Sequence, residues 1–330
     1  MSDLLLRLMR PLARISESLA PGPTGRVAFR LFCTPPRPKQ GRHRAAAVKT
    51  PAARLDGGTV FSVPFPCGSI TAHRFESAPR SDGDAAPCVL LLHGWTGRAT
   101  AMSGFVQPLL DAGFRVVAFD LPGHGASTGT TLDLPTGVAS LAAVARAVGP
   151  VEAIVAHSFG GSIALAALAG TLPAQPRVTA KRLVLIAPPS SMQEVARWFA
   201  DRIGLGPRGL RALEARIHAV AGVPVTAFAG AAQLQRYGGP TLLLHCRDDR
   251  EVPLAHAQAL ADAGPFVRLE AQSGLGHRRI LTAPRIAALV AEFVAGRAEP
   301  APAQTQPINS RRTTASIAST PSGESFRQGR

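Results

Sequence analysis

The chain has 330 residues, of which 46% are hydrophobic, so it is long and apolar enough to bury a sizeable core. No apolar run reaches the roughly 18 residues of a membrane-spanning helix, and we expect a soluble protein or one held at a membrane surface. The net charge of +15 is concentrated at the ends, since residues 1–55 hold eleven lysines and arginines against two acids and residues 297–330 hold five against two, which argues against a nucleic-acid-binding domain.

Residues 1–57 predict a basic extension made of an amphipathic helix and a linker. In residues 1–20, arginines line one face and apolar side chains recur every three or four positions on another; the apolar set is Leu5, Leu8, Leu12, Ile15 and Leu19. Arg7 and Arg10 interrupt the apolar core that a secretory signal needs. Two interpretations remain open: the helix lies on an anionic membrane, or it packs on the rest of the protein or on a partner. Residues 21–57 are rich in Pro, Gly and Arg, which predicts a linker or a wrapped arm.

Residues 58–297 alternate between strand and helix patterns. A hairpin is predicted at 59–64 and 69–74, with further strands near 87–92, 115–119, 152–156, 182–187, 240–245 and 266–270. Helical patterns lie at about 100–112, 132–148, 159–171, 254–263 and 283–295. This alternation with apolar strands predicts an α/β fold with a mostly parallel central sheet and helices on both faces. The last segment, 298–330, is poor in large apolar residues and is expected to be a disordered tail.

Polar motifs follow five of the predicted strands, at the carboxyl ends where parallel sheets carry their chemistry. They are His93-Gly94-Trp95-Thr96-Gly97, Asp120-Leu121-Pro122-Gly123-His124-Gly125-Ala126-Ser127, Ala156-His157-Ser158-Phe159-Gly160-Gly161, His245-Cys246-Arg247-Asp248-Asp249-Arg250-Glu251-Val252-Pro253 and Gly274-Leu275-Gly276-His277. In this order, the motifs resemble the α/β-hydrolase superfamily over residues 58–297, and within it the serine esterase, lipase and thioesterase branch. The one departure is Ala156, where the family's G-x-S-x-G turn has glycine, a difference of one methyl group.

The resemblance implies a catalytic triad of Ser158, His277 and an aspartate. Ser158 lies between a strand and a helix, where the family carries its nucleophile in a strained turn. A serine hydroxyl needs a base, and His277 follows the last strand in a glycine-rich loop from which an imidazole can reach across. The imidazole in turn needs a carboxylate. The family's spacing of Asp, two residues and Val-Pro selects Asp249, with Asp248 as the alternative.

Attack on a carbonyl also needs donors for the oxyanion. By the same resemblance, the backbone N–H groups of Trp95 and Phe159 form the oxyanion hole. His93 and His157 are expected to be structural, not catalytic bases.

The strand–helix alternation pauses between about residues 190 and 237. Two apolar stripes at helical spacing lie there, at the position where the family carries a cap, so we expect a small helical cap over the site. The stripes are Met192, Val195, Phe199 and Ile203, and Leu210, Leu213, Ile217 and Val220. An apolar cap favours an acyl or aromatic substrate.

The implied activity is hydrolysis of a carboxylic ester or thioester through an acyl-enzyme intermediate. Hydrolysis of a carbon–carbon bond beside a ketone, or acyl transfer to another acceptor, uses the same triad. A non-catalytic, membrane-docked binding module is the alternative from another class, because a fold does not by itself prove an activity.

We expect no cofactor and no metal, since this chemistry is complete without them. The expected partner is a small-molecule acyl substrate, with no nucleic acid, and peripheral contact of residues 1–20 with an anionic membrane is a further hypothesis; the oligomeric state stays open. Four scattered cysteines indicate free thiols in a reducing compartment. The expected location is the cytoplasm, at the inner face of the membrane if the N-terminal helix binds lipid. The richness in Arg, Ala, Gly and Pro is typical of a GC-rich bacterial genome.

Overall fold

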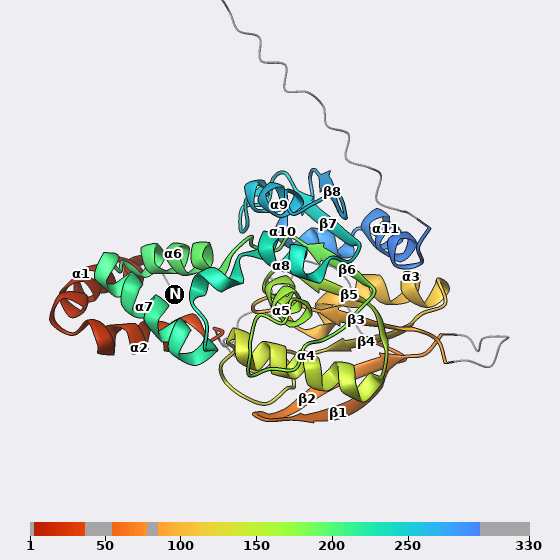
Figure 1. Ribbon diagram of the computed structural model, residues 1–330, viewed down its shortest axis with the longest axis horizontal. Coiled ribbons are helices and arrows are strands. Elements are labelled where there is room, and N and C mark those ends of the chain that lie inside the picture. Colours follow the sequence, from red (N-terminus) through yellow and green to blue (C-terminus); the bar gives the residue numbers. More distant parts are fainter. Residues whose placement is uncertain (1–2, 37–54, 78–84, 298–330) are drawn as a thin grey trace, which may run out of the picture.

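The described part of the chain is built around one eight-stranded sheet. The computed structural model describes residues 3–36, 55–77 and 85–297. The strand order is β1-β2-β4-β3-β5-β6-β7-β8, with β1 and β2 antiparallel at one edge and all neighbours from β4 to β8 parallel (Figure 1). The strands are β1 (Thr59–Phe65), β2 (Gly68–Phe75), β3 (Cys88–Leu92), β4 (Arg115–Phe119), β5 (Val151–His157), β6 (Arg182–Ile186), β7 (Thr241–Cys246) and β8 (Val267–Gln272). The predicted mostly parallel sheet is confirmed.

Helices cover both faces of the sheet and complete two hydrophobic clusters. Successive side chains of a strand point to opposite faces, so Leu90 and Leu92 of β3 join the cluster of α4 and α5, whereas Val89 and Leu91 join that of α3 and α11. These helices and their neighbours are α3 (Val106–Asp111), α4 (Leu134–Val148), α5 (Phe159–Leu168), α8 (Gly230–Tyr237), α9 (Leu254–Ala261), α10 (Gly276–Arg279) and α11 (Pro284–Val294), with 3-10 helices at Ala99–Phe105, Val225–Phe228 and Ile280–Thr282. The two covered faces agree with the α/β prediction.

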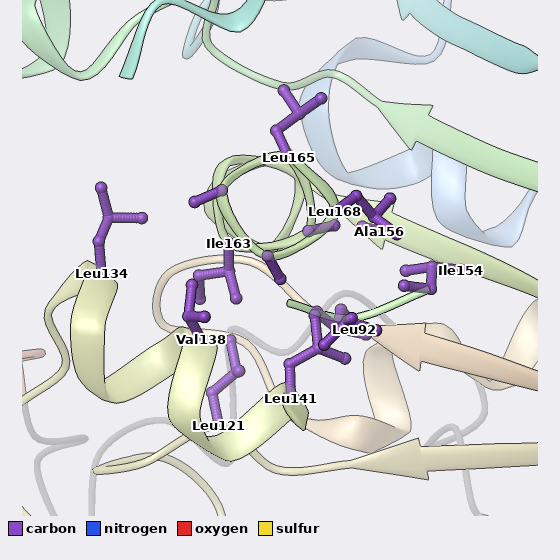
Figure 2. Close-up of a cluster of buried hydrophobic side chains, with 14 of the residues drawn as sticks. Leu92, Leu121, Leu134, Val138, Leu141, Ile154, Ala156, Ile163, Leu165 and Leu168 are labelled. Atoms are coloured by element: carbon purple, nitrogen blue, oxygen red, sulfur yellow. The ribbon is translucent and has the colours of Figure 1, made fainter. Parts of the chain in front are cut away.

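Helix α5 is enclosed on all sides. Every residue from Gly160 to Leu168 is buried. Figure 2 shows Ile163 of α5 above Val138 of α4, in a cluster that includes Leu92 and Ala156 of the sheet. A helix packed in this way cannot shift without opening the core, so it is a rigid base for the residue that precedes it.

Four helices form a lobe beside the sheet, which we call the helical lobe (Figure 1). They are α1 (Asp3–Leu19), α2 (Pro21–Phe32), α6 (Met192–Ile203) and α7 (Pro207–Ala221). Helices α6 and α7 contain the two apolar stripes of the region from about 190 to 237. Helices α1 and α2 come from the N-terminal extension and contact both the cap helices and each other, with α2 running along α7.

Helix α2 occupies part of the segment for which the sequence predicts a linker. Pro21 stands in its first turn, where a missing N–H costs no hydrogen bond, and Gly25 and Ala28 are buried. Small residues let α2 approach α7 closely, so the helix is stabilised by a surface that is remote in sequence. The rest of the predicted linker, 37–54, and the predicted tail, 298–330, lie outside the described residues.

Helix α1 is held to the start of α7 by a buried carboxylate on its polar face. The Glu17 carboxylate is buried and accepts hydrogen bonds from the backbone N–H groups of Gly206 (2.6 Å) and Gly209 (2.8 Å). Both groups lie at the start of α7, which has no cap from a side chain of its own. On the opposite face of α1, Ile15 and Leu19 are exposed. A carboxylate 189 residues away in sequence thus caps a helix of the predicted cap.

This arrangement bears on the two interpretations of the N-terminal helix. The helix packs on protein, as one of them holds, but the contact runs through Glu17 and not through the described part of its apolar stripe. The side chains of Leu5, Leu8 and Leu12 are not among those that the structure describes. Among the described residues, no helix is both long and apolar enough to cross a bilayer.

Replacing Glu17 should destabilise the fold. In Glu17→Ala, two buried N–H groups at the start of α7 lose their acceptor, and we expect the free energy of unfolding to fall by about 1–3 kcal/mol in urea titrations. Arg14→Ala is the matched control, because Arg14 is mostly exposed and lies 3.9 Å from the Glu17 carboxylate; its effect should stay below about 0.5 kcal/mol. Equal stability of Glu17→Ala and the unchanged chain would contradict this account of α1.

Candidate active site

Ser158 lies in a strained turn between β5 and α5. Its backbone has φ 51° and ψ −122°, and residues other than glycine rarely adopt such a positive φ. The close approach of α5 to β3 leaves no space beside the turn: a Cβ on Gly160 would stand 2.5 Å from the carbonyl oxygen of His93. The methyl group of Ala156, the departure from the family pattern, is fully buried in the core. The turn therefore holds Ser158 at the carboxyl end of the sheet.

Three side chains form a hydrogen-bonded chain at this edge. His277 Nε2 lies 3.1 Å from Ser158 Oγ, and His277 Nδ1 lies 2.7 Å from Asp249 Oδ2. The carboxylate accepts a hydrogen bond from Nδ1–H, so the unprotonated Nε2 is left to take the serine proton. Ser158 follows β5, Asp249 follows β7 and His277 follows β8, and parallel pairing brings these strand ends together. The geometry is that of a nucleophile, a base and a carboxylate that orients the base.

The two candidate carboxylates have different surroundings. Asp249 is buried, and its Oδ1 accepts hydrogen bonds from the backbone N–H groups of Glu251 (2.8 Å) and Val252 (2.9 Å). Burial opposes ionisation of Asp249, but the hydrogen bonds from His277 and from these N–H groups outweigh it and lower its pKa. Asp248 is exposed and accepts the N–H of Gly274 instead (2.9 Å). The structure thus places Asp249 against the imidazole of His277. Asp248 instead holds the loop that precedes His277, through its hydrogen bond with Gly274.

The residues predicted for the oxyanion hole lie on either side of Ser158. Phe159 is the first residue of α5, where backbone N–H groups have no acceptor inside the helix. Trp95 follows Gly94, whose Cα is so close to Ser158 that an added Cβ would stand 2.8 Å from the serine Cβ. The Trp95 and Phe159 rings also contact edge to face, with centroids 5.8 Å apart. Both segments therefore adjoin the serine hydroxyl and can offer N–H groups to an oxyanion.

Three other histidines hold the backbone around the site. His93 Nε2 accepts the N–H of Leu121 (2.9 Å), and His124 Nε2 accepts that of Thr96 (3.1 Å). His157 Nε2 lies 3.0 Å from the carbonyl oxygen of His277. Burial lowers the pKa of all three, to about 4 for His93 and to about 3 for His157, so they stay uncharged at neutral pH. None of them contacts the serine hydroxyl by a hydrogen bond, in keeping with a structural role.

His245 is a contributor that the sequence analysis did not single out. Its ring is buried; Nε2 lies 2.8 Å from the carbonyl oxygen of Val252 and 3.7 Å from Asp249 Oδ2. Burial lowers its pKa, so the neutral ring donates its Nε2 proton to the carbonyl and holds the turn that carries Asp249. The sequence shows only that His245 lies at the end of a predicted strand. That position does not predict a contact with the turn that carries Asp249, four residues later.

A cavity of about 1130 Å³ opens above Ser158. Ser158, His277 and Trp95 line its floor side, and its walls are mostly apolar side chains of α2, α6 and α7. Six of them are Leu31, Phe32, Val195, Phe199, Ile217 and Val220. The sequence stripes allow either core packing or a substrate wall, and the structure shows both: six of their eight residues line the cavity, whereas Leu213 is buried in the core and Leu210 packs against it. The sequence analysis did not predict the wall from α2, because no local sequence pattern indicates that an N-terminal segment reaches the cavity.

The described residues hold no group of three or more His, Cys, Asp or Glu side chains with the arrangement of a metal site. What the site offers is a nucleophile, a base and N–H donors at the floor of an apolar cavity.

The match with a protein family covers more than half of the chain. Residues 89–289 match the model described as the alpha/beta hydrolase family, and this range contains all five predicted site residues. No curated protein sequence matches the chain.

Several solved structures are similar in fold. An esterase from Pyrococcus furiosus aligns with a TM-score of 0.55 and 18% identity, over 79% of this chain and 98% of that one. The thioesterase domain from the curacin biosynthetic pathway aligns at 0.51 and 18%, over 73% and 100%. A meta-cleavage product hydrolase from Pseudomonas fluorescens aligns at 0.51 and 19%, over 72% and 98%. At such low identities the likeness shows the fold alone. The substrate therefore has to be inferred from the geometry of this chain's own site.

The two aspartates can be separated by experiment. Asp249→Asn removes the charge that stabilises the imidazolium and disturbs the tautomer, so we expect fluorophosphonate labelling of Ser158 to slow by about 10²–10⁴-fold. Asp248→Asn makes the same chemical change on a carboxylate that bonds Gly274 and not His277, and should alter the labelling rate only slightly. The opposite ranking of the two rates would identify Asp248 as the partner of the imidazole.

Proposed function

The chain belongs to the alpha/beta hydrolase family, and on that premise we propose that it is a serine hydrolase that cleaves a carboxylic ester or thioester through an acyl-enzyme. The observation that carries the proposal is the hydrogen-bonded chain of Ser158, His277 and Asp249 at the floor of an apolar cavity. A hydroxyl becomes a nucleophile only next to a base, and here the base is within hydrogen-bonding distance and is itself oriented by a carboxylate.

The reaction follows from these positions. Ser158 Oγ attacks the carbonyl carbon while His277 Nε2 takes its proton, and Asp249 stabilises the imidazolium. The backbone N–H groups of Trp95 and Phe159 stabilise the oxyanion of the tetrahedral intermediate. When the intermediate collapses, the imidazolium returns the proton to the leaving alcohol or thiol, and the acyl group stays on Ser158. Water, deprotonated by His277, then attacks the acyl carbon; the bond from this carbon to Ser158 Oγ breaks, the imidazolium protonates Oγ, and the acid leaves.

The cavity favours substrates with a sizeable apolar part. Its walls from α2, α6 and α7 are lined by Phe, Leu, Ile and Val side chains, which gain free energy by covering an alkyl or aryl group. Its volume of about 1130 Å³ exceeds what an acetyl group needs. We therefore propose that the acyl part is a medium or long alkyl chain or an aromatic acid. Because the charged side chains Arg202 and Glu194 also line the cavity, the leaving group can be polar.

Removing the nucleophile or the base should abolish turnover. Ser158→Ala and His277→Ala should each lower kcat for a p-nitrophenyl ester by about 10⁴–10⁶-fold, with an unchanged melting temperature. Ser162→Ala, the same substitution one turn into α5, is the matched control and should keep its activity. Mass spectrometry of the quenched reaction should find the acyl group on Ser158. Undiminished turnover by Ser158→Ala would exclude the proposal.

Filling the cavity should change chain-length preference. Val195 of α6 lines the cavity and is partly exposed to it. In Val195→Trp, kcat/KM for a decanoyl ester should fall by about tenfold or more relative to that for an acetyl ester, because the longer chain loses its space. Val195→Ala is the control that widens the same wall and should leave the preference for the longer ester in place. A proportional loss for both esters in Val195→Trp would show that the acyl chain lies elsewhere.

A further inference from the structure

Exposed apolar side chains gather on the helical lobe. The described residues leave six large apolar side chains exposed, and five of them, which we call the apolar rim, lie on α1, α2 and α6; they are Ile15, Leu19, Val27, Leu31 and Trp198. Only Val60 lies elsewhere, on β1. Single exposed apolar residues are ordinary on a protein surface, but a concentration on neighbouring helices marks a surface that contacts something apolar.

The apolar rim is what remains after these helices have made their contacts with the protein. Helix α1 docks through Glu17, and Ile15 and Leu19 lie on its other face, 57% and 82% exposed. Helix α2 docks through Gly25 and Ala28, and Val27 is 61% exposed on its outer side. Ile15 and Leu19, the described part of the apolar stripe of α1, are therefore not used to hold the helix on the protein, and burial in the described fold does not explain them.

The apolar rim is continuous with the cavity above Ser158. Leu31 of α2 and Trp198 of α6 line the cavity and are also exposed, so they form its mouth. Next to them, Phe32 and Phe199 contact edge to face with ring centroids 5.0 Å apart, which joins α2 to α6 on the inner side. The apolar rim and the apolar part of the cavity wall thus share Leu31 and Trp198, with the charged side chains of Arg30, Glu194 and Arg202 beside them in the lining.

Exposed arginines lie on α2 and α6, two of the helices that carry the apolar rim. Arg26 and Arg30 of α2 and Arg202 of α6 are exposed, and the Arg202 guanidinium lies over the Trp198 ring, 5.7 Å from its centroid. The chain that follows α2 is strongly basic in sequence, since residues 37–54 contain six lysines and arginines and no acidic residue. Apolar side chains among exposed arginines match a bilayer with anionic headgroups, because the arginines meet the phosphates while the apolar groups enter the acyl layer.

We propose that the apolar rim is a docking surface for an anionic lipid bilayer, which it holds against the mouth of the cavity. Docking itself does not depend on the proposed hydrolase activity. Its consequence for substrate access does: acyl substrates would enter from the lipid phase between Leu31 and Trp198. Neither a second copy of the chain nor a basic segment of its own matches the surface as well, because both would bring more arginine to arginine.

Vesicle co-sedimentation tests the docking. The full-length Ser158→Ala chain, which cannot turn over lipid, is mixed with vesicles of phosphatidylcholine alone or with added phosphatidylglycerol. We expect binding to the anionic vesicles at ~0.1 M salt and release at ~1 M salt, where the Debye length falls from about 10 Å to about 3 Å. Equal binding to both kinds of vesicle, or none to either, would overturn the proposal.

Two pairs of variants locate the surface. The double variant Ile15→Ser/Leu19→Ser should lower vesicle affinity by about tenfold or more. Its control, Val60→Ser, changes a side chain that is as exposed as Val27 but lies on β1, and should not lower the affinity.

Arg26→Glu should lower vesicle affinity by about tenfold, whereas Arg146→Glu, the same charge change on an exposed residue of α4, should not. Equal losses in a variant and its control would show that vesicles bind elsewhere on the protein.

Further measurements on the same proteins separate the outcomes. Since Ile15 and Leu19 are exposed, the double variant should keep its melting temperature in the Ser158→Ala chain. In a chain that retains Ser158, it should keep its rate on a soluble ester. Loss of ester hydrolysis with intact vesicle binding would refute the hydrolase and not the docking. A dimer in vesicle-free solution that dissociates in Ile15→Ser/Leu19→Ser would show that a second copy covers the rim, and would refute the docking.

Discussion

The chain passes from the parallel strand β5 to helix α5 through a single residue, Ser158, and the site is arranged around that turn. With φ at 51°, the residue is held in a conformation that its neighbours have to enforce. They do so because α5 is buried on all sides and β5 is paired on both edges, so neither can relax. The same closeness admits only small groups at Gly94 and Gly160. The strain fixes the hydroxyl in the open at the floor of the cavity, where a relaxed serine at a helix start would turn back to cap its own helix.

The loops around Ser158 are fixed by neutral imidazoles instead of by charges. Buried His93, His124 and His157 bond to backbone atoms, and burial lowers the pKa of each, so they hold their geometry without adding positive charge near the base. His157 links the nucleophile's strand to the backbone of His277. The buried Asp249 is then the group that favours a positive charge on the proposed base, and its own pKa is lowered because hydrogen bonds from His277 and from backbone N–H groups outweigh the effect of burial.

The helical lobe forms much of the cavity wall above this site. Its cavity is closed by α6 and α7, which are inserted after β6, and by α2, which precedes the whole sheet. Glu17 ties the N-terminal helices to the start of α7, so a segment that looks peripheral in sequence becomes part of the wall. Because Glu17 on the polar face of α1 makes this contact, Ile15 and Leu19 on the other face are left exposed. Substrate access and surface binding are thereby proposed to share one structural element.

The sequence by itself determined the elements whose pattern is local. Apolar runs such as 88–92 predicted strands that the structure has, and motifs at their ends predicted which residues would meet. It also narrowed the acid to Asp248 or Asp249, and the family's spacing pointed to the one that the structure places 2.7 Å from His277. Only the tertiary structure decided where Glu17, His245 and α2 act. Their partners are many residues away or face a turn that has no local signature, and the free energy of such contacts arises from surfaces that exist only once the chain has folded.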